Sequence, residues 1–69
     1  MIVNNVSTLI GKRKMTKSET AKLAGLDYNT VDNLYRDKTK GIEFETMNKL
    51  CFALDCSTGD LFTYIPDNK

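Results

Sequence analysis

The stretch that decides the fold is TKSETAKLAGLDYNTVDNLYR, residues 16–36. It opens on TKSE at 16–19, a capping box in which the threonine hydroxyl and the glutamate carboxylate satisfy each other's backbone N–H groups. This box predicts a helix over residues 17–24, because Gly25 follows it and glycine commonly ends helices. An aspartate, a residue type that caps helix starts, then precedes a second expected helix over residues 28–37.

Two short helices joined by a glycine-containing turn form a helix-turn-helix, here over about residues 17–36. The first helix needs a small residue where the second crosses it, and the turn needs a residue that tolerates a positive φ angle. Apolar side chains must fill the space beneath the turn and between the helices. Six positions hold the residue types that this geometry requires: Ala21, Ala24, Gly25, Leu26, Val31 and Leu34.

Three further segments carry apolar residues at helical spacing. We expect a helix over about residues 6–14, in which Arg13 closes the apolar stripe through its aliphatic stem. Another helix is expected over about residues 43–54. The weaker capping box STGD at 57–60 opens a fifth helix, which is expected to run to residue 65 before a proline stops it.

These segments predict an all-α fold of five helices, since no stretch shows the alternation typical of a strand. Residues 1–69 are expected to form a single domain, because 69 residues are too few for two, and 66–69 should form a frayed tail. The aromatic side chains expected in the core are Phe44, Phe52 and Phe62.

The composition excludes several function classes. The chain has no histidine and two cysteines, so it offers no zinc-finger ligand set, no histidine base and no Cys–His nucleophile pair. Cys51 and Cys56 are interpreted as small buried hydrophobic residues rather than metal ligands. No set of residues supplies a nucleophile, a base and a pocket, so we expect no enzyme, cofactor or metal. With no ligand-binding domain in the sequence, we expect no small-molecule ligand either.

The sequence also indicates where the protein acts. No window approaches the apolar length of a membrane span, and the first residues lack the charged and apolar regions of a signal peptide. We therefore expect a soluble, cytoplasmic protein with no membrane partner.

The small net charge of +1 hides an uneven distribution. Residues 1–40 contain eight basic and four acidic side chains, a balance of +4, whereas residues 41–69 contain two basic and five acidic side chains, a balance of −3. A basic half is a possible footprint for a polyanion. Solvated helix faces that happen to segregate would give the same pattern, so the charge alone does not decide.

Most of the chain, about residues 6–65, resembles the Cro-like, phage-repressor-like DNA-binding domains of the xenobiotic-response-element group, in particular its small stand-alone bacterial branch. The resemblance is carried by Met15–Glu19, Ala21, Gly25-Leu26, Thr30-Val31, Leu34-Tyr35, Thr46–Cys56 and Gly59–Leu61. It implies a compact five-helix fold of the lambda-repressor type with a central helix-turn-helix, and sequence-specific binding to double-stranded DNA.

Two positions depart from the family pattern. Thr20 stands where the family usually has leucine, and Leu23 is apolar where a polar residue is common. A slight rotation of the helix over 17–24 would reconcile the two. Alternatively, Leu23 is exposed and contacts a partner.

In this motif the second helix, here residues 28–37 and called the recognition helix, enters the major groove, and its N-terminal part reaches the base edges. With Val31 and Leu34 buried, the opposite face of the helix is polar. We expect four residues to contact base edges: Tyr28, Asn29, Thr30 and Asn33. Asp32 has two alternatives, accepting a hydrogen bond from cytosine or pointing aside to form a salt bridge.

Phosphate contacts are expected at both ends of the motif. The start of the helix over 17–24 offers an amide, a hydroxyl and an ammonium group to a phosphate. Cations also follow the recognition helix and can contact the flanking strand. The predicted phosphate-binding residues are Thr16, Lys17, Arg36, Lys38, Thr39 and Lys40, with Lys12–Lys14 as a further cluster in which Arg13 could instead be structural.

Two function classes remain. The first is a transcriptional regulator that binds a specific duplex sequence, expected to be a repressor and a homodimer on a two-fold operator. Its interface is expected at 62–65, which is apolar for a tail. The second is a protein-interaction module, such as an adaptor or antitoxin-like partner, because Leu23, Tyr28 and the two acids on the recognition helix also suit a protein surface.

Overall fold

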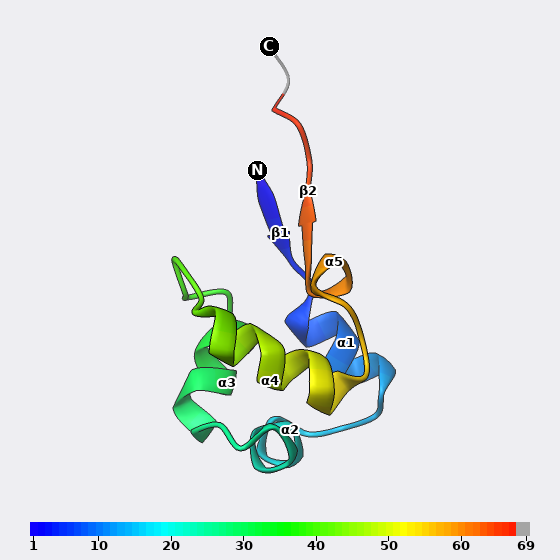
Figure 1. Ribbon diagram of the computed structural model, residues 1–69, viewed down its shortest axis with the longest axis vertical. Coiled ribbons are helices and arrows are strands. Elements are labelled where there is room, and N and C mark those ends of the chain that lie inside the picture. Colours follow the sequence, from blue (N-terminus) through cyan, green and yellow to red (C-terminus); the bar gives the residue numbers. More distant parts are fainter. Residues whose placement is uncertain (68–69) are drawn as a thin grey trace.

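The computed structural model describes residues 1–67, which fold into a helical body with a two-stranded ribbon at one end (Figure 1). The helices are α1 (Val6–Lys12), α2 (Lys17–Ala24), α3 (Tyr28–Tyr35), α4 (Phe44–Leu54) and α5 (Thr58–Leu61). The strands are β1 (Ile2–Asn4) and β2 (Phe62–Tyr64). All five predicted helices are present, which confirms the helical fold. The frayed tail predicted over 66–69 lies partly outside the described residues.

One apolar core holds the helices together. α2 packs against α3 and α4, and α1 packs against α3. Leu50 and Leu54 of α4 are fully buried, as are Val6 of α1 and Val31 of α3. Because the two helices of the helix-turn-helix both pack into this core, the core fixes the direction in which α3 projects.

Local signals set the ends of α2 as predicted. The Thr16 hydroxyl accepts a hydrogen bond from the Glu19 backbone N–H at 3.1 Å, and the Glu19 carboxylate accepts one from the Thr16 backbone N–H at 2.8 Å. Gly25 ends the helix with a φ of +70°, a conformation that costs a residue with a Cβ atom free energy. The second capping box is also present, since the Ser57 backbone N–H donates to Asp60 Oδ2 at 3.0 Å.

Arg13 is structural. Its Nε donates to the carbonyl of Leu54 at 2.8 Å, and its Nη2 donates to the carbonyl of Asp55 at 2.9 Å. These carbonyls belong to the end of α4, where backbone acceptors lack partners within the helix. Arg13 therefore joins α1 to the C-terminus of α4, and its guanidinium is engaged there.

The ribbon corrects the prediction that the chain has no strands and that the fifth helix continues to Ile65. α5 ends at Leu61, and Phe62 takes extended backbone angles of −135° and 135°. β2 then pairs antiparallel with β1 in the register Ile2–Tyr64, Val3–Thr63 and Asn4–Phe62. The residues of β2 are aromatic and β-branched, types that favour strands, but their partner lies about 60 residues away along the chain.

The aromatic core prediction is wrong for two of its three residues. Phe44 and Phe52 are 87% and 74% exposed, whereas Phe62 is partly buried against the core. Phe52 lies two residues from both Leu50 and Leu54, about 160° around the helix from each, so it points away from the core. Phe44 is the first residue of α4 and is exposed at that end of the helix. The apolar residues of this segment belong to two faces of α4, one in the core and one in solvent, and helical spacing does not distinguish them.

Thr20 and Leu23 settle how α2 is oriented. Thr20 is fully buried, and its hydroxyl donates to the Thr16 carbonyl at 2.9 Å, which satisfies its hydrogen-bonding need within the helix. Leu23 is 52% exposed. The suggested rotation of α2 is therefore absent, and the alternative of an exposed Leu23 describes the structure.

The two cysteines are less buried than expected. Cys51 and Cys56 are free and half-buried, and both pack against the core. Burial raises the pKa of the Cys56 thiol, and the neighbouring Cys51 adds to this shift. Both therefore act as packing residues at the margin of the core.

Candidate nucleic-acid interface

α3 has one face in the core and one face in solvent. Val31 and Leu34 are buried, whereas Asn29 and Asn33 are exposed and Tyr28 is 44% exposed. The helix thus presents amide groups and a phenol side by side on its outer surface. These are three of the four residues predicted to contact bases, and the structure leaves them accessible.

The fourth predicted base-contacting residue, Thr30, lies at the border of this face. It is half-buried and lines a shallow hollow of about 290 Å³ between α3 and the start of α4. Asn33 and Thr46 line the same hollow. Thr30 therefore faces the chain that follows α3 more than Asn29 does.

The two residues predicted to bind phosphate at the start of α2 already have partners inside the domain. The Thr16 hydroxyl is used as the acceptor of the capping box. Lys17 Nζ lies 2.8 Å from Oδ1 of Asp32, and its side chain is 23% exposed. The same ammonium lies 4.9 Å from the centre of the Tyr35 ring, a favourable cation–π distance.

Asp32 has taken the second of its two predicted roles, that of a salt-bridge partner. Its Oδ1 accepts hydrogen bonds from Lys17 Nζ and, at 3.0 Å, from Arg36 Nε. These bonds, first that of Lys17 and then that of Arg36, hold the pKa of Asp32 below its ordinary value, although partial burial opposes the shift. The same contact with Asp32 raises the pKa of Lys17.

Exposed cations continue the surface past the end of α3. Arg36 follows the helix, and its side chain is 55% exposed. Asp37, at a φ of +58°, turns the chain, and the Lys38 backbone N–H then donates to the Asn33 carbonyl at 2.9 Å. Residues 38–40 are all exposed, so two lysines and a threonine lie next to the last turn of α3.

A model of the Cro/C1-type helix-turn-helix DNA-binding domains matches residues 5–67, which is nearly the whole chain. The chain belongs to this family. It is 32% identical over 66 residues to the uncharacterized HTH-type transcriptional regulator YozG of Bacillus subtilis (strain 168). The match covers 96% of this chain and 79% of that relative. The family resemblance predicted from the sequence is confirmed, and this Cro/C1-type domain is a DNA-binding regulator of transcription.

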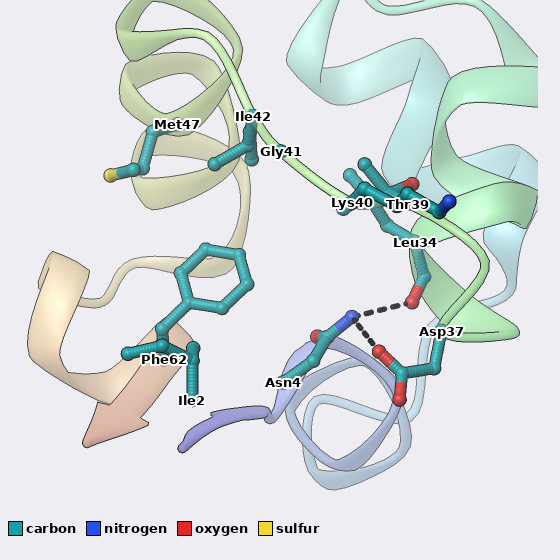
Figure 2. A pocket seen from close by; sticks show the side chains of 10 residues that line it. All are labelled: Ile2, Asn4, Leu34, Asp37, Thr39, Lys40, Gly41, Ile42, Met47 and Phe62. Atoms are coloured by element: carbon teal, nitrogen blue, oxygen red, sulfur yellow. Dashed lines mark hydrogen bonds between the residues drawn. The ribbon is translucent and has the colours of Figure 1, made fainter.

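The ribbon of the Cro/C1-type domain is tied to the recognition helix through one side chain that the sequence did not reveal. Asn4 Nδ2 donates to the Leu34 carbonyl at 2.9 Å and to Asp37 Oδ1 at 3.3 Å (Figure 2). Asn4 Oδ1 accepts from the Val6 backbone N–H at 2.9 Å. One amide at the end of β1 therefore contacts the start of α1, the end of α3 and the turn that follows α3. No local signal could have shown this, because the partners lie about 30 residues apart.

Next to Asn4 the Cro/C1-type domain has an open hollow of about 440 Å³. Figure 2 shows Ile2 and Phe62 of the ribbon on one side of it and the chain after α3 on the other. Met47 of α4 also lines it. The hollow lies between the ribbon and residues 39–42. Beside it, the two hydrogen bonds from Asn4 join the ribbon to the end of α3 and the turn after it.

None of the helices in residues 1–67 of this Cro/C1-type domain has both the length and the apolar character needed to cross a membrane. Within the same residues, no group of three or more histidine, cysteine or acidic side chains lies close enough to hold a metal ion.

Proposed function

We propose that this domain is a transcriptional repressor that inserts α3 into the major groove of double-stranded DNA. An α-helix fits that groove, where each base pair presents its own pattern of donors, acceptors and methyl groups. The observation that carries the proposal is the exposure of Asn29 and Asn33 beside the buried Val31 and Leu34. An exposed asparagine amide can donate to and accept from one adenine at the same time.

The contacts fall into two sets. Base edges are contacted by Asn29 and Asn33, by Tyr28 through a thymine methyl group or a phosphate, and at the margin by Thr30. Phosphates are contacted by Thr16, Lys17, Arg36, Lys38, Thr39 and Lys40. Within the second set, Lys17 and Arg36 reach a phosphate only in competition with Asp32, whereas residues 38–40 are exposed in the domain itself.

We also propose that the domain acts as a homodimer joined through the ribbon. A single recognition helix contacts few base pairs, so a two-fold operator with half-sites roughly 34 Å apart would supply the missing specificity. The ribbon supports this proposal because Tyr64 and Ile65 are 66% and 46% exposed, and Ile2 is 63% exposed. Tyr64 and Ile65 lie in the segment predicted to form the interface, and Ile2 is paired with Tyr64 on the neighbouring strand.

Repression would follow from the place on the DNA where the dimer binds. A dimer bound across a promoter excludes the polymerase from the same DNA. The domain carries out this role in the cytoplasm, on the DNA of the nucleoid. The support for this location is the family itself, whose members bind DNA.

Selection from a random duplex library at moderate salt tests the proposal, with the mass of the protein in solution measured alongside. A palindromic consensus together with a dimer mass is the expected result. Salt-sensitive binding without a consensus would contradict specific recognition, because counterion release alone gives that behaviour. A monomer mass on the selected duplex would contradict the dimer.

A second candidate, a protein-interaction module, is favoured by three exposed apolar side chains on α2 and α4. Leu23 of α2 and Phe44 and Phe52 of α4 are 52%, 87% and 74% exposed. Apolar side chains that gather into one contiguous patch on a surface mark contacts with other proteins. The same library distinguishes the two candidates, since a module of this kind would enrich no duplex at all.

A further inference from the structure

Asp32 lies between two of the cations that are proposed to bind phosphate. A single oxygen, Oδ1, accepts from Lys17 Nζ at 2.8 Å and from Arg36 Nε at 3.0 Å. The side chains of Asp32 and Lys17 are 21% and 23% exposed, so this pair is largely shielded from solvent. Arg36 is 55% exposed and keeps part of its guanidinium in water.

Two tyrosines restrict where the Lys17 ammonium can go. It lies 4.9 Å from the centre of the Tyr35 ring and 5.9 Å from that of Tyr28. With Asp32 in contact and aromatic rings nearby, the ammonium has a defined position beside α3. A lysine that is held in this way does not move to bind the phosphates of an arbitrary duplex. A free surface lysine would do so.

The charge of Asp32 acts on duplex binding in two ways. Its carboxylate is on the outer half of α3, where it repels phosphates. It also occupies hydrogen-bond donors of two cations, and each phosphate that a protein neutralises contributes about 0.9 to the slope of binding against salt, on logarithmic axes. Both effects weaken contacts to the backbone, which carry no information about sequence.

We propose that Asp32 is a positioning residue that sets the ratio between operator binding and random-duplex binding, by holding Lys17 and Arg36 on its carboxylate. This inference rests on the proposed function. A random duplex offers only phosphate contacts. Because Asp32 holds Lys17 and Arg36, a random duplex loses the phosphate contacts of both cations and gains nothing in exchange. The operator adds base contacts from Asn29 and Asn33, which bring the helix close enough for phosphates to compete for the two cations.

The test compares Asp32→Asn with Asp27→Asn. Both changes remove one negative charge from the chain at α3 or its N-cap. Asp27 is exposed, forms no side-chain cap bond to the helix, and holds neither cation. The two variants therefore share a change in net charge and differ in the release of Lys17 and Arg36. Dissociation constants are measured on a selected duplex and on a scrambled duplex across a range of salt concentrations.

For Asp32→Asn we expect binding to the scrambled duplex to strengthen by about tenfold for each freed cation at about 0.1 M salt, with a slope steeper by about one for each. Binding to the selected duplex should strengthen less, so the dissociation constant for the scrambled duplex divided by that for the selected duplex falls. Asp27→Asn should leave the slope and the ratio near the wild-type values. Asp32→Glu, which keeps the charge, should restore weak binding to the scrambled duplex.

Adding Lys17→Ala to Asp32→Asn should remove about one unit of the gained slope. Equal slopes for Asp32→Asn and Asp27→Asn would overturn the proposal and leave a plain charge effect. Weaker binding of Asp32→Asn to both duplexes would also overturn it, because Asp32 would then serve the fold alone. Failure of the wild-type domain to bind either duplex would refute the proposed function itself, a result that is distinct from both.

Discussion

Three polar side chains make hydrogen bonds inside this domain, and two of them join separate elements. Asn4 joins the ribbon to α3, Asp32 joins α2 to α3, and the buried Thr20 places its hydroxyl on its own helix. Within residues 1–67, no buried side-chain nitrogen or oxygen lacks a hydrogen-bond partner. An unpaired buried polar group would cost about 1–3 kcal/mol, so polar residues at these positions are compatible with a small core.

Asn33→Ala and Asn29→Ala should each lose specificity at particular base pairs. The amide is the group that discriminates adenine, so we expect a loss of about 1–3 kcal/mol on the selected duplex and little change on a scrambled one. Competition binding with single-base variants of the operator measures this loss. Asn48→Ala, an exposed asparagine on α4, is the matched control. Equal losses on both duplexes would show that the amides do not contact bases.

Acid should destabilise the domain through Asp32. Hydrogen bonds from Lys17 and Arg36 hold the pKa of Asp32 below its ordinary value, so the folded state binds this proton more weakly than the unfolded state. The stabilisation is present above the unfolded pKa of about 3.9 and is lost as the pH falls through the lower folded pKa. Thermal unfolding of the wild type should therefore shift more between about pH 5 and about pH 2 than that of Asp32→Asn.

Asp27→Asn serves as the control for this pH profile, because it keeps the contacts of Asp32 and should follow the wild type. The profile would contradict the assignment if Asp32→Asn lost stability in acid as steeply as the wild type does. Lys17 gives the opposite sign, since its raised pKa makes its contribution present below the unfolded pKa and lost at high pH.

At the scale of elements, the sequence predicts well where the signal is local. The capping box at 16–19 and Gly25 lie next to the ends that they determine, and α2 begins and ends as they predict. β2 was predicted as helix because its strand character depends on pairing with β1, at the other end of the chain. Phe44 and Phe52 were placed in the core because periodicity does not tell an inner apolar face from an outer one.

Gly25 and Gly11 provide a matched test of whether a positive φ angle makes glycine necessary at the end of α2. Neither Gly25 nor Gly11 has a neighbour within 4 Å of an added Cβ atom, so alanine fits at both positions. Gly25 has a φ of +70°, and we expect Gly25→Ala to destabilise the domain by about 1–2 kcal/mol. Gly11 lies in α1, where Gly11→Ala should stabilise it by about 0.5–1 kcal/mol. Denaturant unfolding measures both, and a stabilised Gly25→Ala would contradict the role of the turn.

The candidate site follows the same division at this scale. The exposure of Asn29 and Asn33 follows from the burial of Val31 and Leu34, so helical spacing alone predicted it. The pairing of Lys17 with Asp32 joins two helices across the turn. The spacing of residues along one helix cannot predict such a contact. Contacts within one helix are therefore predictable from the sequence, whereas contacts between elements come from the packed structure.

The whole molecule is elongated, with principal extents of 41, 21 and 19 Å, because the ribbon extends beyond the helical body (Figure 1). An isolated two-stranded ribbon is marginally stable in water. Its outer residues Ile2 and Tyr64 are directly paired and mostly exposed, so they contribute little to the core of the domain itself. A second copy that covers this surface would stabilise both ribbons.

Tyr64→Arg should therefore convert the proposed dimer to a monomer without unfolding the body. Two exposed arginines placed near each other across a two-fold axis repel, and apolar contact area is lost. Sedimentation equilibrium measures the mass, and thermal unfolding reports the fold. Phe52→Arg is the control, since Phe52 is exposed on α4 and lies outside the ribbon. A dimer that persists in Tyr64→Arg but not in Phe52→Arg would place the interface on α4.

Asn4 gives the ribbon a further consequence in such a dimer. The hydrogen bonds from its side-chain amide to Leu34 and Asp37 connect the proposed interface directly to the end of the recognition helix. In such a dimer these contacts hold the distance between the two recognition helices constant, because no flexible hinge separates the interface from α3. A domain built in this way would tolerate base changes between its half-sites far better than the insertion of a single base pair.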